Sequence, residues 1–303
     1  MQTPRLRAYL MLLVVAIIWG IAPPVIKYTL QGFSPEIFLT YRFGISTILA
    51  IIIFSIGGFH IPRDFRTIVT IVIYGFINSV VALSFLFFGM ENTTVLETGL
   101  ITLSSPLIIS AAGVYLLHEH VTKREKIGMT IAMLGTALTI FGPLVTNGHG
   151  TLKFSGNIMV FGYVITTLVT TLMMKSLLKK NVNPITMTNL SFIIGFISFL
   201  IFVFFKGHQI SVNEFLNIKP IYHLGVLYMA VLSGTLAFYL NTKAQKTIEI
   251  GEASVFTYLD PIVSLPLAVL WLGEKVTPIY IIGGIIIIIG VVIAEIKKRR
   301  YNT

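Results

Sequence analysis

Residues 278–293 read PIYIIGGIIIIIGVVI and contain no charged side chain. With the residues that flank it, this run approaches the ~20 apolar residues with which a helix crosses a bilayer. Every backbone amide must be paired inside lipid, which leaves helices and closed barrels as membrane spans. Barrel strands alternate apolar and polar residues over about ten positions, and this run does not alternate. The stretch therefore predicts a transmembrane helix.

The rest of the chain has the same apolar character. Of its 303 residues, 55% are hydrophobic and 11% charged, whereas soluble domains carry roughly 25% charged residues. We therefore expect an all-α integral membrane protein with its first apolar run retained as a span, not cleaved as a signal peptide. Apolar windows separated by turn residues and charges predict ten transmembrane helices, at 8–30, 35–57, 67–88, 94–117, 127–145, 155–177, 185–205, 221–242, 253–273 and 278–296.

Cysteine content and charge placement narrow the classes of function. The chain has no cysteine, which excludes a disulfide framework, a thiolate metal site and a cysteine nucleophile. The Lys and Arg residues behind its net charge of +10 lie mostly in short loops. There they predict how the spans are oriented in the membrane, and they do not indicate a nucleic-acid partner. Lys and Arg cluster near Arg5, at Lys123–Lys126 and at Lys297–Arg300. The positive-inside rule then predicts a multi-pass protein of the cell (inner) membrane with both termini cytoplasmic.

An internal repeat appears when the sequence is shifted by 155 residues. Two five-helix repeats, residues 1–148 and 151–303, are predicted from this shift. Because each holds an odd number of spans, the second enters the membrane inverted, as in secondary transporters with a central cavity. The shift superimposes Glu97 on Glu252, Thr102 on Thr257, Pro106 on Pro261, Glu119 on Glu274, Gly128 on Gly283 and Gly135 on Gly290.

The order of these motifs resembles the drug/metabolite transporter superfamily, specifically its EamA-type members. The resemblance covers nearly the whole chain and implies ten spans around a central cavity, with export of amino acids or other small metabolites. Asp260 departs from the family pattern, in which an uncharged residue is usual. The resemblance rests on Ile18-Trp19-Gly20, Tyr41-Arg42-Phe43, Ser105-Pro106-Leu107, Glu119, Gly128 and Gly135, with the second copy at Asp260-Pro261-Ile262, Gly273-Glu274, Gly283 and Gly290.

Two prolines fall inside predicted spans. Pro106 and Pro261 cannot donate to the carbonyls four residues earlier, so those of Thr102 and Thr257 are freed. Such backbone is tolerated at membrane depth where it faces protein or a wet cavity. We expect these four residues to line a cavity; the alternative is a packing kink in which each threonine hydroxyl satisfies nearby backbone.

Two charged residues also lie inside predicted spans. An ionisable group near mid-membrane costs at least ~2.5–3.5 kcal/mol, so Asp260 is expected to face the bundle interior as a proton-coupling or amine-binding carboxylate. The alternative is a carboxylate paired with a hydroxyl or with Arg42. Arg42 is expected to bind a substrate carboxylate; equally, it could snorkel outward or tie helices together through backbone carbonyls.

Several further polar or aromatic residues lie inside spans and are candidates to line a metabolite cavity, although helix packing is the alternative for each. Glu97 and Glu252 fit helix N-termini, and Glu119 and Glu274 are interpreted as loop or gate residues. Close helix contacts are expected at Gly128, Gly135, Gly283, Gly284 and Gly290. His118 and His120 beside Glu119 make a poor metal site, so no metal or cofactor is predicted. The candidates are Trp19, Tyr41, Tyr74, Asn78, Tyr163, Asn189, Tyr239 and Tyr258.

The function that these features favour is secondary active transport. We expect export of amino acids or related small metabolites by alternating access. The expected partners are a small-molecule substrate and the lipid bilayer. Transport could be coupled to protons, and the sequence leaves the oligomeric state open. A passive channel or uniporter is the first alternative, and an intramembrane enzyme is the less favoured one. The sequence holds no phosphate-binding loop, HExxH or GxSxG motif, so a catalytic residue or ATP-driven transport is not predicted.

Overall fold

The computed structural model describes residues 3–57, 62, 64–109, 112, 123–144, 150–207, 215 and 217–295, and all regular structure within them is helical. In this part of the chain, eight helices are long and apolar enough to cross a membrane. Two shorter apolar helices, Val95–Ile109 and Pro278–Ala294, lie where the fourth and tenth spans are predicted. The prediction of an all-helical membrane protein is confirmed.

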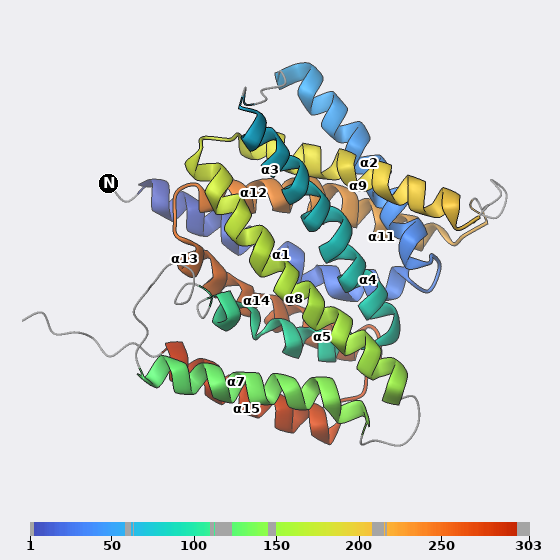
Figure 1. Cartoon of the computed structure of the whole chain (residues 1–303). Helices are drawn as coiled ribbons and strands as arrows, with labels where there is room; N and C mark the ends of the chain where they lie inside the picture. Colours follow the sequence, from blue (N-terminus) through green and yellow to red (C-terminus); the bar gives the residue numbers. More distant parts are fainter. Residues whose placement is uncertain are drawn as a thin grey trace, which may run out of the picture.

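Several helices are interrupted within the bundle, so the elements are more numerous than the spans (Figure 1). Two of the interruptions, η1 and η3, are π-helical turns. The elements are α1 (Thr3–Thr29), α2 (Pro35–Gly57), α3 (Phe65–Phe76), η1 (Ile77–Ala82), α4 (Leu83–Asn92), α5 (Val95–Thr102), α7 (Lys123–Phe141), η2 (Gly142–Leu144), α8 (Gly150–Lys179), α9 (Pro184–Phe205), α11 (Pro220–Tyr228), η3 (Met229–Leu236), α12 (Ala237–Gln245), α13 (Ile250–Ser254), η4 (Val255–Tyr258), α14 (Leu259–Leu270) and α15 (Pro278–Glu295).

Side-chain caps explain where some of these helices begin. Asn183 accepts a hydrogen bond from the Ile185 amide at the start of α9. At the start of α5, the Thr94 hydroxyl accepts from the Glu97 amide at 3.0 Å, as the sequence suggests. The Glu97 carboxylate accepts from the Thr93 hydroxyl at 2.7 Å. The region therefore holds a local polar cap that satisfies amides which a helix start leaves free.

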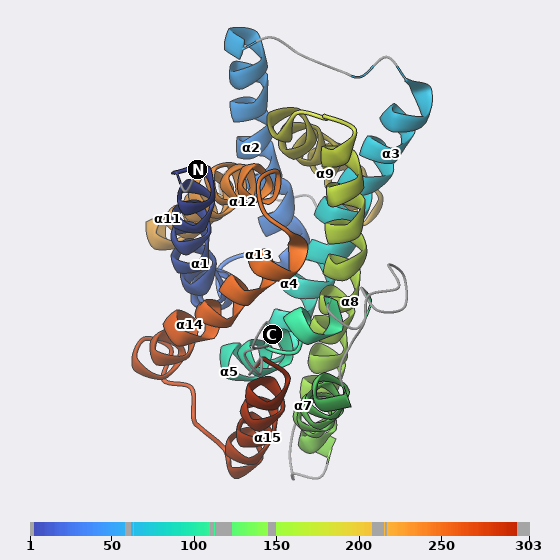
Figure 2. The same cartoon turned by 90° about the vertical axis from the view of Figure 1, so that its left-hand side faces the viewer.

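The helices form two bundles that face each other. The α1 bundle contains α1 with α11–η3–α12 and α13–η4–α14, and the α8 bundle contains α8 with α3–η1–α4 and α5. Helix α5 also packs against α14 of the α1 bundle. The first helix of each sequence half thus packs with elements from the other half. Figure 2 shows the pair α2 and α9 closing one side and the pair α7 and α15 closing the opposite side.

Two lysines mark the opposite ends of the bundles. Lys27, near the end of α1, contacts the turn between α4 and α5. Lys175, near the end of α8, contacts the turn between α12 and α13. Arg5 at the start of α1 pairs with Glu252 of α13, so the chain starts at the second of these ends. We call them the Lys27 end and the Lys175 end.

Helices α7 and α15 touch through glycines. A Cβ atom added at Gly128 would lie 2.5 Å from the Ala294 nitrogen and 2.6 Å from the Gly290 oxygen. A Cβ added at Gly290 would in turn lie 2.6 Å from the Gly128 oxygen. Lipid-embedded helices associate by such close packing of small residues. The interpretation of these glycines as close helix contacts is confirmed.

This contact predicts a specific loss of stability. In Gly290→Ala the new methyl meets backbone atoms that cannot yield, so we expect overpacking to cost about 1–3 kcal/mol and to lower the melting temperature in detergent. Gly284→Ala on the same helix is the control, because its methyl would meet the flexible end of Leu100 at 3.3 Å. Equal melting temperatures for the two variants would contradict the glycine contact.

Candidate functional site

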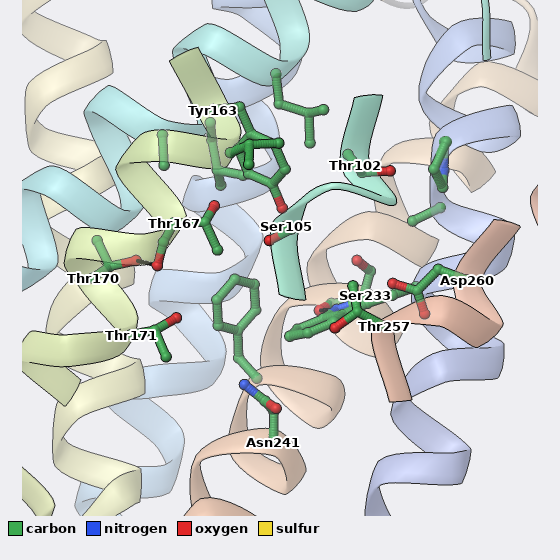
Figure 3. Close-up of a pocket in the computed structure, with 18 of the residues that line it drawn as sticks. Thr102, Ser105, Tyr163, Thr167, Thr170, Thr171, Ser233, Asn241, Thr257 and Asp260 are labelled. Atoms are coloured by element: carbon green, nitrogen blue, oxygen red, sulfur yellow. Dashed lines mark hydrogen bonds between the residues drawn. The ribbon is translucent and has the colours of Figure 1, made fainter. Parts of the chain in front are cut away.

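A cavity of about 200 Å³ lies between the two bundles. Hydroxyl, amide and aromatic side chains make up much of its wall. Figure 3 shows α8 threonines on one side of the cavity, with Thr257 and Asp260 on the other. The lining polar and aromatic residues are Trp19, Arg42, Tyr74, Asn78, Thr98, Thr102, Ser105, Tyr163, Thr167, Thr170, Thr171, Ser233, Phe238, Asn241, Gln245, Ser254, Thr257, Asp260 and Ser264.

Most of the residues singled out from the sequence come together at this cavity. They arrive from α1, α2, α3, η1, α5, α8, η4 and α14, so the predicted set is gathered from both sequence halves. Whether they touch a substrate stays a prediction. The predicted residues that line the cavity are Trp19, Arg42, Tyr74, Asn78, Thr102, Tyr163, Thr257, Asp260 and Pro261.

The other predicted residues do not line this cavity, and their positions on the helices explain why. Tyr41, Pro106, Tyr239 and Tyr258 each sit one residue away from a lining residue, and successive helical residues point about 100° apart. Asn189 is buried on α9, outside both bundles.

Two of these residues make other contacts instead. The Tyr41 ring packs 5.1 Å from the ring of Phe215. The Lys243 ammonium lies 5.2 Å from the ring centroid of Tyr239. Such ring and cation contacts can account for aromatic residues inside helices without any role in a cavity.

Arg42 is a buried cation with free donors. Its side chain is 1% exposed, and its Nε and Nη1 atoms have no hydrogen-bond partner. The guanidinium carbon lies 5.4 Å from the ring centroid of Phe43 and 5.7 Å from that of Phe87. This burial does not fit a side chain that snorkels to the membrane surface. Because unpaired buried donors are costly, the arrangement suits an anionic ligand supplied from the cavity.

Asp260 lies on the other side of the cavity, at the start of α14. The structure describes both Asp260 and Arg42 and forms no ion pair between them. The alternative in which the two residues neutralise each other is therefore wrong. The cavity thus presents a guanidinium and a carboxyl group at separate points.

Trp19 joins α1 to the π-helical turn η3. Its indole nitrogen donates to the Ser233 carbonyl at 3.1 Å. The Tyr228 hydroxyl donates to the Ile18 carbonyl at 2.6 Å. Non-α turns inside helices recur at functional sites, and here the turn presents Ser233 to the cavity. Trp19 is both a cavity wall and a structural tie within the α1 bundle.

The sequence analysis missed most of the hydroxyl groups in the wall. Residues 163–174 of α8 read YVITTLVTTLMM, and Tyr163, Thr167, Thr170, Thr171 and Met174 all line the cavity. Their spacing of three and four places them on one helix face. The periodicity of threonine in this otherwise apolar helix is the signal that could have identified them.

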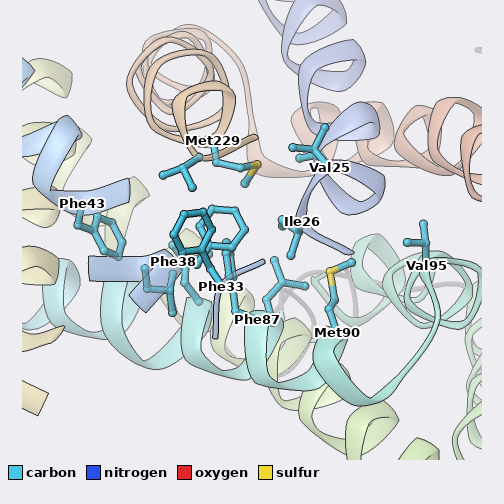
Figure 4. Close-up of a cluster of buried hydrophobic side chains, with 14 of the residues drawn as sticks. Val25, Ile26, Phe33, Phe38, Phe43, Phe87, Met90, Val95 and Met229 are labelled. Carbon is cyan, nitrogen blue, oxygen red and sulfur yellow. The ribbon is translucent and has the colours of Figure 1, made fainter. Parts of the chain in front are cut away.

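The Lys27 end of the space between the bundles is filled by apolar side chains. Figure 4 shows Val25 and Ile26 of α1 close to Met90 of α4 and Val95 of α5. Phe87 and Phe38 continue this cluster, with ring centroids 4.9 Å apart. Toward the other end, the cavity wall includes Gln245, which is next to the turn that Lys175 contacts. The cavity therefore extends from mid-bundle toward the Lys175 end.

In the part of the chain that the structure describes, no group of three or more His, Asp or Glu side chains comes together. His118, Glu119 and His120 lie outside the described residues.

Comparison with known proteins finds relatives that are named as transporters or as an efflux pump. "Uncharacterized transporter YyaM" of Bacillus subtilis is 26% identical, over 99% of this chain and 97% of that protein. "Uncharacterized transporter YetK" of the same species is 29% identical over 71% of this chain and 64% of its own length. A protein of Salmonella typhimurium named "Probable amino-acid metabolite efflux pump" is 23% identical over 93% of this chain and 92% of that protein.

A solved structure, titled "Crystal structure of protein", shares the fold. It superimposes with a TM-score of 0.66 at 16% identity, over 98% of this chain and 99% of that one. The model of the EamA-like transporter family matches residues 6–141 and again residues 154–295. The resemblance to EamA-type drug/metabolite transporters is thereby confirmed, and the chain belongs to the EamA-like transporter family.

Proposed function

We propose that this membrane transporter is a secondary active exporter of amino acids or related small metabolites, working by alternating access. One observation carries the proposal: a cavity that extends from mid-bundle toward one end presents an unpaired, buried Arg42 and a separate Asp260. Alternating access requires such a site between two bodies that can rock against each other.

The two charged residues suit a zwitterionic ligand. A guanidinium offers several N–H donors that can bind a carboxylate, and the Nε and Nη1 atoms of Arg42 have no other partner. A carboxylate at Asp260 can bind an ammonium group, or it can carry a proton across the membrane. The printed name of the Salmonella relative, an efflux pump for amino-acid metabolites, supports this substrate class and direction.

The proposed architecture is ten transmembrane helices in two inverted five-helix repeats around the cavity. The two matches of the family model and the π-helical turns η1 and η3, one in each half, support it. The Lys175 end also carries Arg5, Arg66, Lys179 and Lys246. By the positive-inside rule this end is cytoplasmic, so we propose an inner-membrane protein with both termini in the cytoplasm.

Substrate binding is tested by counterflow in proteoliposomes loaded with zwitterionic amino acids. Arg42→Lys is expected to raise the KM for substrates that carry a carboxylate by roughly tenfold, because a compact ammonium cannot reproduce the planar set of guanidinium donors. Asp260→Asn is expected to remove the dependence of transport on a pH gradient. Tyr41→Phe is the matched control, since Tyr41 neighbours Arg42 but does not line the cavity.

Two outcomes of this experiment oppose the proposal. A passive channel would show neither saturation nor acceleration by substrate on the opposite side. An unchanged KM in Arg42→Lys, together with an unchanged pH response in Asp260→Asn, would remove the assigned roles of both residues.

Water access to the cavity gives a separate prediction. The chain has no cysteine, so single cysteines report on their surroundings directly. Thr167→Cys and Thr171→Cys are expected to react with a water-soluble maleimide, because both positions line the cavity. Val169→Cys on the same helix should not react, because its side chain is on the outer, membrane-facing surface. Equal reaction at all three positions would contradict a wet cavity walled by α8.

A further inference from the structure

Lys27 binds backbone carbonyls of the opposite bundle. Its ammonium donates to the carbonyl oxygens of Met90 at 2.7 Å, Glu91 at 3.2 Å and Thr93 at 2.7 Å. Lys27 belongs to α1, whereas these carbonyls end α4 and begin the turn into α5. The last carbonyls of a helix have no partner within the helix. A single side chain of the α1 bundle therefore satisfies several free acceptors of the α8 bundle.

Glu274 makes a second contact between the bundles at the same end. Its carboxylate accepts hydrogen bonds from the amides of Val95 at 2.7 Å and Leu96 at 2.9 Å. These are the first residues of α5, whereas Glu274 follows α14. A carboxylate at this position satisfies amides that the helix leaves free and complements the helix dipole. Lys27 and Glu274 thus hold adjacent parts of one turn.

Lys175 makes the corresponding contact at the other end of the cavity. Its ammonium donates to the carbonyls of Gln245 at 2.8 Å and Ile248 at 2.5 Å. The shift of 155 residues that relates the repeats carries Met90 onto Gln245 and Thr93 onto Ile248. The two lysines therefore bind equivalent carbonyls at opposite ends, each reaching from one bundle to the other. Glu119, which the shift relates to Glu274, lies outside the described residues.

We propose that Lys27 and Glu274 form the gate that closes the Lys27 end of the cavity, and that Lys175 forms the gate at the opposite end. This inference rests on the alternating-access function proposed above. The bundles separate at one end when the charged groups leave the backbone of the facing turn, and water then solvates both. Exchanging protein hydrogen bonds for water costs little net free energy, so such contacts can open and close reversibly.

The other charged contacts and the glycine contact do not have this arrangement. Arg5 and Glu252 pair within the α1 bundle, and Lys206 of the turn after α9 pairs with Glu36 of α2 at 3.0 Å. The α7–α15 contact is made by apolar surfaces and glycine backbone, which have no comparable exchange with water. Among the residues that the structure describes, the gate is therefore confined to the two turns at which charged side chains reach from one bundle to the other.

Cysteine labelling in oriented vesicles tests the gate. Ala22→Cys is the reporter, because Ala22 lines the cavity and is 6% exposed. Adding Glu274→Gln is expected to raise its rate of reaction with a membrane-impermeant maleimide from the Lys27 face by about tenfold. Glu97→Gln is the matched control: Glu97 lies at the same end, but its carboxylate accepts from Thr93 of its own bundle.

The outcomes separate the gate from the transport function. If Glu274→Gln labels no faster than Glu97→Gln from the Lys27 face, the gate is wrong. Should Glu274→Gln fail to fold, Lys27→Met is measured in its place, with the same expectation. Labelling needs no substrate, so a faster reaction without amino-acid counterflow would leave the gate standing and reject the proposed substrate class.

Discussion

A backbone carbonyl or amide that loses its helical partner must find another hydrogen-bond partner, because a buried, unpaired backbone group is costly. This constraint acts at the turns between α4 and α5 and between α12 and α13, where helices end and restart at the boundary between the bundles. The partners are Lys27, Glu274 and Lys175, each supplied by the facing bundle. The same need for hydrogen bonds that shapes the turns thus joins the bundles at the two ends of the cavity.

The charged contacts at the two turns contrast with the contact between α7 and α15. There, Gly128 and Gly290 bring two backbones together without polar side chains, and such packing resists any separation. The pair can serve as a fixed wall beside the bundles, while the charged contacts at the turns carry the change of conformation. The cavity with Arg42 and Asp260 lies between these ends.

The helical membrane class and the glycine contact could be predicted because both depend on local composition and spacing. Thr102, Pro261, Arg42 and Asp260 could be predicted as cavity residues from the prolines and charges inside spans, because such groups are costly in lipid and must face the interior. Lys27 was not identified from the sequence, since its role depends on how α1 packs against the α4–α5 turn. Tyr239 was predicted for the cavity instead of its neighbour Phe238 because the rotation of a helix that is apolar on all sides is set by tertiary packing.

The central claim is that the two ends of the cavity open in turn. Spin labels at Glu91→Cys and Val276→Cys measure the separation of the bundles at the Lys27 end, and labels at Lys179→Cys and Lys246→Cys measure it at the Lys175 end. Distances from double electron–electron resonance, with and without a transported amino acid, should change in opposite directions at the two ends. Distances that lengthen together at both ends would contradict the account.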